Sequence, residues 1–408
     1  MDKNDLNLFV IILLALGIIA LLAQIYVVFF LTIFICLFIF FLRYWTEHIF
    51  DKLTVERNFT REKVFSGQKF YLEIVISNKK LMPIIWLKLR SRISYEISFE
   101  NPRYCSDIIG KRKVYQDLFS IKSYQTVKRK YALRVEKRGV MSSYMHVITY
   151  TDPLGFTKEY IDNEGISLIV YPRVLPLSAP LVDFALLFGS KPEAGWIFQD
   201  KLNRTGVRPY SSSDSFRQIN WKASARSLEL KSDIYKPSFD REVFIFHGLS
   251  KEYKIKDKAT INNVELSIIT AASLAEKYFQ AGFTLSFYSN MKTKYSLRKD
   301  YLSISVKANQ KQRELVYTAL AQLKEKSDFA IEDIINIEKR NIVSTATIII
   351  IIDSIDRDLI RVINLLKKNN NIILITIGKS DKVLNGIKQF YINDKEAWDE
   401  IEKIQLFH

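Results

Sequence analysis

The sequence is poor in the residues that build disulfide frameworks and metal centres. Its 408 residues include two cysteines and four histidines. Cys36 lies inside a long apolar run and Cys105 lies far downstream, so no disulfide framework is implied and a reducing compartment is allowed. None of the histidines stands at a metal-ligand spacing from another; they are His48, His146, His247 and His408.

The short motifs of the common enzyme classes are also missing. The chain has no Walker-type phosphate loop, no Gly-x-Ser-x-Gly elbow, no His-Glu-x-x-His helix and no Cys-x-x-Cys pair. No helix-turn-helix, zinc finger or aromatic RNA-reading strand is visible, so nucleic acid is not expected as a partner. The acidic pairs Asp356/Asp358 and Glu332/Asp333 are interpreted as solvated helix surfaces. We therefore expect a binding protein with no catalytic residues, and not an enzyme.

The first fifty residues are, by contrast, rich in apolar side chains. Residues 6–42 are almost continuously apolar. One transmembrane helix needs about 20 residues, so this run predicts two spans, at 8–23 and 26–42, with Gln24 at the turn between them. A single long tilted helix is the alternative. A signal peptide is not expected, because the run is too long and no small-residue cleavage site follows a short apolar core.

Basic residues predict how this hairpin, residues 1–50, is oriented. The chain carries a formal net charge of +16. The basic residues that follow the second span are Arg43, Lys52, Arg57, Arg61 and Lys63, whereas Lys3 before the first span is offset by Asp2 and Asp5. Positive charge marks the cytoplasmic side of a membrane protein. We therefore expect both ends of the chain in the cytoplasm of a multi-pass protein, with the lipid bilayer as a partner of its basic body.

Residues 53–172 change to an alternation of apolar and polar side chains. Segments such as 69–78 (KFYLEIVISN) and 83–99 are rich in Ile, Val, Phe and Tyr, as strands are. Turn signals at Ser66-Gly67, Arg138-Gly139 and Asp152-Pro-Leu-Gly155 separate the segments. Many short strands without helices between them predict a β-sandwich of the immunoglobulin or fibronectin kind.

Residues 241–408 alternate between the two periods. Predicted strands lie at 242–247, 283–288, 346–352, 371–377 and 389–392, with an antiparallel strand at 294–297. Predicted helices lie at 264–280, 310–324, 357–367 and 395–404. This alternation predicts an α/β domain with an open, doubly wound sheet, so the whole chain is expected to be a multidomain protein.

A connector, residues 173–240, joins the two predicted domains and contains the most distinctive stretch, 206–236. Its marked positions are Arg208, Tyr210, Asp214, Arg217, Ile219, Trp221, Lys222, Ala225 and Arg226. A helix is predicted from near Ser215, capped by Ser213 or Asp214, with Phe216, Ile219 and Ala223 on its apolar face. Such Arg, Asp and Trp residues fit structural glue or a partner-docking surface. The alternative is an anion- or nucleotide-binding site, or an enzyme, built on the arginines of 208–226.

This pattern of nine residues resembles the signature of the bacterial family called domain of unknown function 58 (DUF 58), with Ser213 standing where the family usually has glycine. The fragments 137–139, 152–156 and 170–172 also resemble that family. The resemblance implies a von Willebrand factor A-like domain at 241–408. It also implies a MoxR-type AAA+ ATPase as partner, with a role in the assembly or maturation of envelope or metalloenzyme complexes. The sequence gives no indication of oligomeric state.

Von Willebrand A domains often bind a divalent metal through Asp-x-Ser-x-Ser after the first strand, and this resemblance directs attention to residues 247–251. These residues read His-Gly-Leu-Ser-Lys, so the first carboxylate is absent. Mg²⁺ prefers carboxylate and water oxygens. We predict a degenerate site that does not hold Mg²⁺ tightly, with Ser250 and Asp353 as its remaining candidate ligands and no cofactor. Asp353 by itself is predicted to be a helix N-cap.

Overall fold

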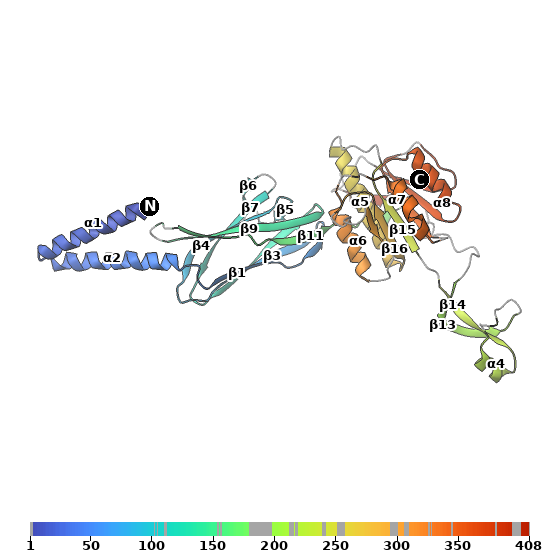
Figure 1. Cartoon of the computed structure of the whole chain (residues 1–408), viewed down its shortest axis with the longest axis horizontal. Helices are drawn as coiled ribbons and strands as arrows, with labels where there is room; N and C mark the ends of the chain where they lie inside the picture. The colour runs from blue at the N-terminus through green and yellow to red at the C-terminus, as the bar shows by residue number, and fades with distance from the viewer. Residues whose placement is uncertain are drawn as a thin grey trace. The chain divides into compact units, whose positions relative to one another are not determined.

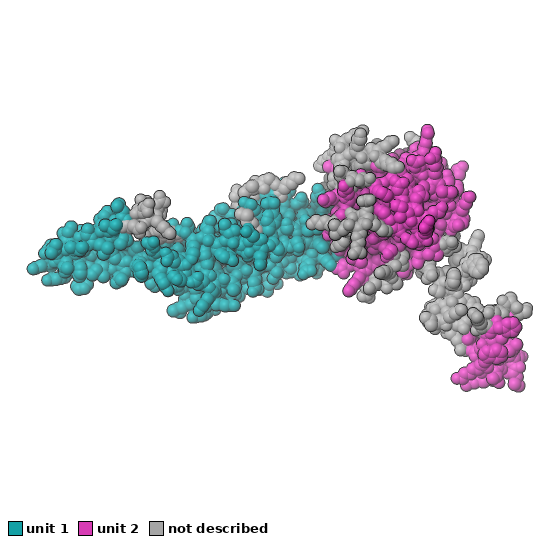
Figure 2. Space-filling model, viewed as in Figure 1, with its two compact units in different colours: residues 1–173 teal, residues 174–408 magenta. Residues whose placement is uncertain are grey.

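The computed structural model describes the chain in two compact units, residues 1–173 and 174–408, coloured separately in Figure 2. The residues it does not describe are 1–2, 102, 104, 110–111, 153–154, 156, 179–197, 212–215, 217–218, 239–241, 251–257, 294–300, 306–309, 325–326, 328, 344–345, 380–381, 394–400 and 408. The two units are treated one at a time below.

The first unit begins with two helices, α1 (Lys3–Leu22) and α2 (Tyr26–Glu47). Gln24 between them has a φ of 59°, which confirms the predicted turn. A Cβ added at Gly17 of α1 would lie 2.8 Å from Oγ1 of Thr32 in α2, so the missing side chain permits the close approach of the helices. Among the described residues, α2 is the one helix long and apolar enough to span a membrane, while the apolar part of α1, Leu8–Leu22, is shorter.

The rest of the first unit consists of strands in the described residues, as the alternating pattern predicts (Figure 1). The strands are β1 (Leu53–Phe59), β2 (Lys63–Phe65), β3 (Lys69–Asn78), β4 (Ile84–Ser94), β5 (Ile97–Phe99), β6 (Cys105–Ile109), β7 (Arg112–Ile121), β8 (Thr126–Val135), β9 (Gly139–Thr151), β10 (Thr157–Asp162) and β11 (Ile166–Tyr171). One sheet has the order β1-β3-β8-β5. The other has the order β2-β11-β9-β4-β7-β6, and β10 pairs with β9.

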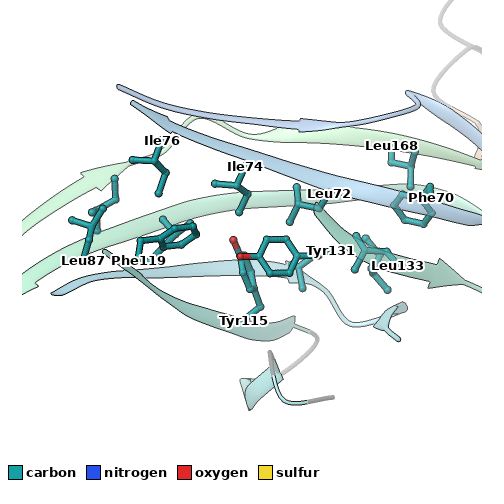
Figure 3. Close-up of a cluster of buried hydrophobic side chains, with 14 of the residues drawn as sticks. Phe70, Leu72, Ile74, Ile76, Leu87, Tyr115, Phe119, Tyr131, Leu133 and Leu168 are labelled. Carbon is teal, nitrogen blue, oxygen red and sulfur yellow. The ribbon is translucent and has the colours of Figure 1, made fainter. Parts of the chain in front are cut away.

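The core of this unit lies between the inward faces of the two sheets. Along β3, Phe70, Leu72, Ile74 and Ile76 are buried while the residues between them are exposed or half-buried. These side chains face others from the second sheet, among them Leu87, Tyr115, Phe119 and Leu168 (Figure 3). Burying one such side chain contributes about 1.5–3 kcal/mol, so the alternation in the sequence is what fixes the inward face.

One basic residue that the sequence suggests for the membrane flank lies instead inside the β-sandwich. Arg57 points inward from β1 and is 7% exposed. Its guanidinium donates to Ser91 Oγ at 3.0 Å and to the Glu164 carbonyl at 2.7 Å. Burial lowers the pKa of Arg57 from its ordinary value. This charge therefore connects the two sheets and does not face lipid headgroups.

The second unit contains a six-stranded sheet of order β17-β16-β15-β18-β19-β20. Its strands are β15 (Glu242–His247), β16 (Thr284–Ser289), β17 (Leu302–Ile304), β18 (Thr347–Ile352), β19 (Asn371–Ile377) and β20 (Lys388–Ile392). Its helices are α5 (Lys258–Gln280), α6 (Gln310–Gln322), α7 (Ile331–Glu338), α8 (Arg357–Leu366) and the 3₁₀ turn η3 (Lys339–Asn341). The strands are parallel except for β17 at one edge.

Helices cover both faces of this sheet. Phe244, Ile348 and Ile350 on one face share an apolar cluster with residues of α7 and α8. On the other face His247 contacts Ser267 of α5. Every position of β18 is consequently buried, which explains why residues 347–352 are apolar without interruption.

Several details of the α/β prediction differ from the structure. The pair Glu332/Asp333 lies on a helix, α7, as interpreted, but Glu332 is 4% exposed and thus not a solvated surface residue. The predicted antiparallel strand at 294–297 lies outside the described residues, and the antiparallel edge that is described is β17. The predicted last helix cannot extend to residue 404, because Ile404–Gln405 forms β21, a strand parallel to β12 (Leu177–Ser178).

The predicted connector contains regular structure where it is described. Strands β13 (Phe198–Pro209) and β14 (Lys231–Ser238) form an antiparallel pair. Helix α4 (Trp221–Ser227) lies between them in sequence. The distinctive stretch of the sequence is thus a β-hairpin whose long connection carries a short helix, and not an irregular linker.

Candidate functional site

The helix of the distinctive stretch begins later than predicted, at Trp221. Its N-cap is Asn220, whose Oδ1 accepts a hydrogen bond from the Ala223 amide at 2.9 Å. The same side chain donates through Nδ2 to Asp233 Oδ1 of β14 at 2.6 Å. An asparagine carries both an acceptor and a donor, so Asn220 starts the helix and ties it to the neighbouring strand. Ser213 and Asp214, the predicted caps, lie outside the described residues.

Ser224 holds the buried side of α4 against β14. Its hydroxyl donates to the Asn220 carbonyl at 2.8 Å and accepts from the Lys231 amide at 2.9 Å. The helix stops at Leu228, which has the left-handed φ of 57°. Polar contacts therefore hold the buried side of this short helix, whereas the sequence pattern predicted that its buried side would be apolar.

The predicted apolar stripe of Phe216, Ile219 and Ala223 is not formed. Ile219 is buried and bridges Ser232 of β14, but Phe216 lies outside the helix with 77% of its surface exposed. The Phe216 ring stacks on Tyr210 with centroids 6.1 Å apart. The reason is the start of the helix at Trp221, which removes the helical spacing on which the stripe depended. Arg217, like Asp214, lies outside the described residues.

The outward side of α4 brings four of the marked residues together. Trp221, Lys222, Ala225 and Arg226 are all exposed, and Trp221 keeps 68% of its surface free. Trp221 and Ala225, like Lys222 and Arg226, are four positions apart and so lie on one face of the helix. We call these four residues the α4 face. It presents one indole and two cations, and of these residue types tryptophan and arginine are enriched at the centres of protein interfaces.

A second candidate place is the carboxyl edge of the α/β sheet. The strand order reverses between β15 and β18, and ligands of open α/β sheets bind at such a switch point. Ser250 follows β15 and Asp353 follows β18. The Asp353 carboxylate accepts from the Ser250 amide at 2.6 Å and from the Ser250 hydroxyl at 2.7 Å. The structure thus brings the two predicted candidates into contact. The prediction that Asp353 caps a helix is wrong, since Asp356 caps α8 through Leu359 N at 2.7 Å.

Asn290, which the sequence did not single out, organises the loop that leads to Ser250. Its side-chain oxygen accepts from the Leu249 amide at 3.0 Å, and its nitrogen donates to the Leu249 carbonyl at 2.7 Å and the Phe329 carbonyl at 2.9 Å. A Cβ at Gly248 would lie 2.2 Å from Asn290 Oδ1, so this approach requires glycine. The signal in the sequence that could have indicated this residue is an asparagine directly after the buried strand β16.

The residues at this edge do not fit a magnesium site. His247, the last residue of β15, is fully buried with its ring nitrogens 3.0 Å from Ser267 Oγ and 3.3 Å from Ser289 Oγ. Mg²⁺ demands octahedral oxygen coordination, and both Asp353 oxygens already accept hydrogen bonds from Ser250. In the described part of the chain no group of three or more acidic, histidine or cysteine side chains could hold a metal ion.

Comparisons with known proteins add only remote likeness. No protein-family model matches the chain, and no curated protein matches it significantly. Among solved structures, a CARDB domain from Pyrococcus furiosus matches with 11% identity over 29% of this chain and 91% of its own, with a TM-score of 0.19. Domains of the major pilin SpaD from Corynebacterium diphtheriae match with 6% identity over 28% and 51%, with a TM-score of 0.22. A cohesin module of a Clostridium perfringens glycoside hydrolase matches with 12% identity over 29% and 95%, with a TM-score of 0.21. At these values the matches carry no argument about function.

Proposed function

We propose that this chain is a membrane-anchored interaction protein of the DUF 58 kind, with its folded units in the cytoplasm. Helix α2 is the anchor, and α1 is its partner in a two-span hairpin. The support is the length and composition of α2, together with Arg43 near its end and the basic residues Lys52, Arg61 and Lys63 that follow it. The α/β unit, in this proposal, is a von Willebrand A-like domain without a working metal site.

The α4 face is the proposed docking surface for a protein partner. The observation that carries this proposal is the exposure of Trp221 beside Lys222 and Arg226, on a helix fixed from behind by Asn220 and Ser224. A tryptophan that served only as internal glue would be covered by its own chain. The family resemblance of these residues supports a MoxR-type AAA+ ATPase as the partner, in the assembly or maturation of other protein complexes.

Affinity capture from detergent-solubilised membranes tests the docking surface. The full chain is expected to recover an AAA+ ATPase, and Trp221→Ala and Arg226→Ala are each expected to reduce recovery by more than tenfold, as interface hot spots do. Leu365→Ala and Arg340→Ala remove an exposed apolar and an exposed basic residue elsewhere in the same unit and serve as matched controls. Equal loss in the controls, or full recovery with both α4 variants, contradicts the proposal.

The alternative is an anion or nucleotide site built on the same stretch. Its support is that Arg208 of β13 and Arg226 of α4 are both exposed and come from one hairpin. Thermal unfolding with inorganic phosphate and with ATP separates the two functions. A rise in Tm with phosphate that Arg208→Ala abolishes, without any captured protein, favours the alternative. Capture of an ATPase with no phosphate-dependent shift favours docking.

The cytoplasmic orientation is tested by reporters fused to the ends of the chain. A fluorescent protein fused after residue 408 is expected to mature and fluoresce, whereas alkaline phosphatase at the same place is expected to be inactive. Active phosphatase at the C-terminus contradicts this orientation. A second reporter fused before residue 1 distinguishes a two-span hairpin, whose N-terminus is cytoplasmic, from a single span, whose N-terminus lies on the other side.

A further inference from the structure

Helix α2 is joined to the β-sandwich by a tight set of contacts at its last turn. Lys80 Nζ donates to the His48 carbonyl at 2.7 Å and also to the Ile49 carbonyl. Thr46 Oγ1 donates to Asp152 Oδ2 at 3.1 Å, and Lys158 Nζ donates to the last carbonyl of α2, that of Glu47. A lysine ammonium suits the negative end of a helix. These contacts fix the end of the β-sandwich to the end of α2.

Apolar packing makes the same junction. Ile49 is fully buried within the core cluster of the β-sandwich, and Trp45 and Phe50 pack against that cluster. The Phe50 ring also lies 6.1 Å from the ring of Tyr160. Because these residues come from the last turn of α2 and the residues directly after it, the end of the helix is part of the sandwich core.

The distance from the membrane follows from helix geometry. The apolar run of α2 ends at Leu42, and the first carbonyl that Lys80 contacts is that of His48. Six residues at 1.5 Å each give a rise of about 9 Å. The headgroup layer on each side of a bilayer is about 5–8 Å thick. If α2 spans the bilayer, this end of the β-sandwich therefore lies at the outer edge of the headgroup layer.

The surface at this end suits such a place. The loop between β3 and β4 contacts the loop between β7 and β8, since the Tyr124 amide donates to the Lys80 carbonyl at 3.1 Å and the Ser123 hydroxyl donates to the Leu81 carbonyl. Leu81 is 74% exposed, Tyr124 71%, and Trp86 at the start of β4 55%. We call these three side chains the rim residues.

The chemistry of the rim residues points to one partner. Tryptophan and tyrosine are enriched where a membrane meets water, because their rings are apolar and carry one polar group. Two exposed lysines, Lys79 and Lys122, belong to the same loops. Each lysine near an anionic membrane surface adds to the electrostatic attraction. Apolar rings beside lysines match the interface of a bilayer that contains anionic lipid.

We propose that the rim residues form a second membrane contact, in which Leu81, Trp86 and Tyr124 sit in the interfacial layer and Lys79 and Lys122 meet anionic headgroups. The contact rests on the proposed anchoring by α2 and goes beyond it. An anchor formed by α2 alone would hold the β-sandwich near the membrane without fixing its orientation. Contact of the rim residues with the interfacial layer holds the β-sandwich at one orientation to the membrane.

Site-directed spin labelling of the full chain in vesicles of phosphatidylcholine and phosphatidylglycerol tests this contact. A nitroxide is attached at Leu81→Cys or Tyr124→Cys after Cys36 and Cys105 are replaced by alanine. The control is Tyr95→Cys, an exposed tyrosine just beyond the far end of β4 (Ile84–Ser94), about 35 Å away at 3.3 Å per residue. The labels at 81 and 124 are expected to show a several-fold higher ratio of oxygen to water-soluble nickel-chelate accessibility than the label at 95.

Each other outcome is informative. If the chain resists an alkaline wash but the three labels are equally accessible to nickel, the second contact is wrong while the anchor stands. Labels at 81 and 124 that are shielded from both reagents indicate a protein neighbour and also overturn the proposal. Release of the chain by the wash removes the α2 anchor and this contact with it. Lys79→Glu combined with Lys122→Glu is expected to lower the ratio, and an unchanged ratio excludes the role of the lysines.

Discussion

Strands β3 and β18 both stabilise a core, but they do so with different sequences. Along β3 the buried side chains alternate with more exposed ones, and charged residues such as Lys69 and Glu73 occupy the outer face. All six residues of β18 are buried, and five of them are isoleucines. A sheet covered on one face needs apolar residues at every second position, while a sheet covered by helices on both faces needs them at every position.

The comparison also extends to buried titratable side chains. Arg57 and His146 lie inside the first unit, where the two sheets meet. Arg57 donates hydrogen bonds to Ser91 and the Glu164 carbonyl, and His146 lies beside Asp162. The central strand β18 carries only Thr347 among its six residues as a polar side chain. A buried charge is tolerated only with partners, and antiparallel strands with polar neighbours can supply them. The first unit should therefore respond to pH in a way that β18 does not.

The largest expected effect comes from truncating a side chain of β18 on either face of the sheet. The side chains of Ile349 and Ile350 point to opposite faces of the sheet, and both are fully buried. The substitutions are Ile349→Ala and Ile350→Ala. Each is expected to lower the free energy of unfolding by about 2–5 kcal/mol, through lost burial and the cavity left behind. Hydrogen exchange of peptides from the second unit, followed in denaturant, measures this. Leu365→Ala on the exposed side of α8 is the control and should change little. A cost below about 1 kcal/mol at either isoleucine contradicts two-sided burial.

The next effect is the pH dependence of the first unit. His146 is 2% exposed and its Nε2 lies 3.1 Å from Asp162 Oδ2. Burial, aided by the charge of Arg57, outweighs this carboxylate and lowers the pKa of His146 from 6.5 to about 4. The unfolded chain then binds a proton that the folded chain refuses. Stability is therefore full above pH 6.5 and is lost as the pH falls toward 4, by about 3 kcal/mol in all at 1.36 kcal/mol per pKa unit.

Denaturant unfolding of the first unit at pH 7.0, 6.0 and 5.0 measures this loss, within a window above most carboxylate titrations. In His146→Gln the slope between pH 6.5 and 5 should disappear, because the substituted side chain does not titrate. His48 is half-buried, and His48→Gln serves as the matched control with the slope retained. A slope that persists in His146→Gln assigns the pH dependence to another group.

The next quantity is the smaller difference in cost between neighbouring positions of β3. Ile74 is fully buried between the sheets, whereas Val75 is half-buried on the outer face. Ile74→Ala should cost about 2–5 kcal/mol, and Val75→Ala about 1 kcal/mol or less, because the outer site can be refilled by water. The difference, about 2 kcal/mol, is the quantity that distinguishes this strand from β18. Equal costs at both positions would show that the outer face of β3 is covered by another part of the molecule.

Much of the fold could be predicted because burial leaves a period in the sequence. The strands at 69–78, 242–247 and 371–377 have the predicted bounds. The acidic pair of helix α7 suggested a solvated surface, although Glu332 is buried. The candidate site was less predictable. The start of α4 depends on Asn220, which hydrogen-bonds to Asp233, and the loop at Ser250 depends on hydrogen bonds to Asn290. These are tertiary contacts between residues 13 and 41 positions apart in sequence, and no local period encodes them.

The smallest effect separates Asp356, the N-cap of α8, from Asp353, to which the sequence pattern assigned a helix cap. Asp356 Oδ1 accepts from the Leu359 amide at 2.7 Å as the N-cap of α8, whereas Asp353 accepts from Ser250. Asp356→Ala is expected to cost about 1 kcal/mol, the usual loss for a cap, and Asp356→Asn should restore most of it because the amide oxygen can accept the same bond. Hydrogen exchange at the first turn of α8 measures the effect. In Asp353→Asn that turn should stay protected while the loop at Leu249 and Ser250 exchanges faster. The reverse pattern would return the capping role to Asp353.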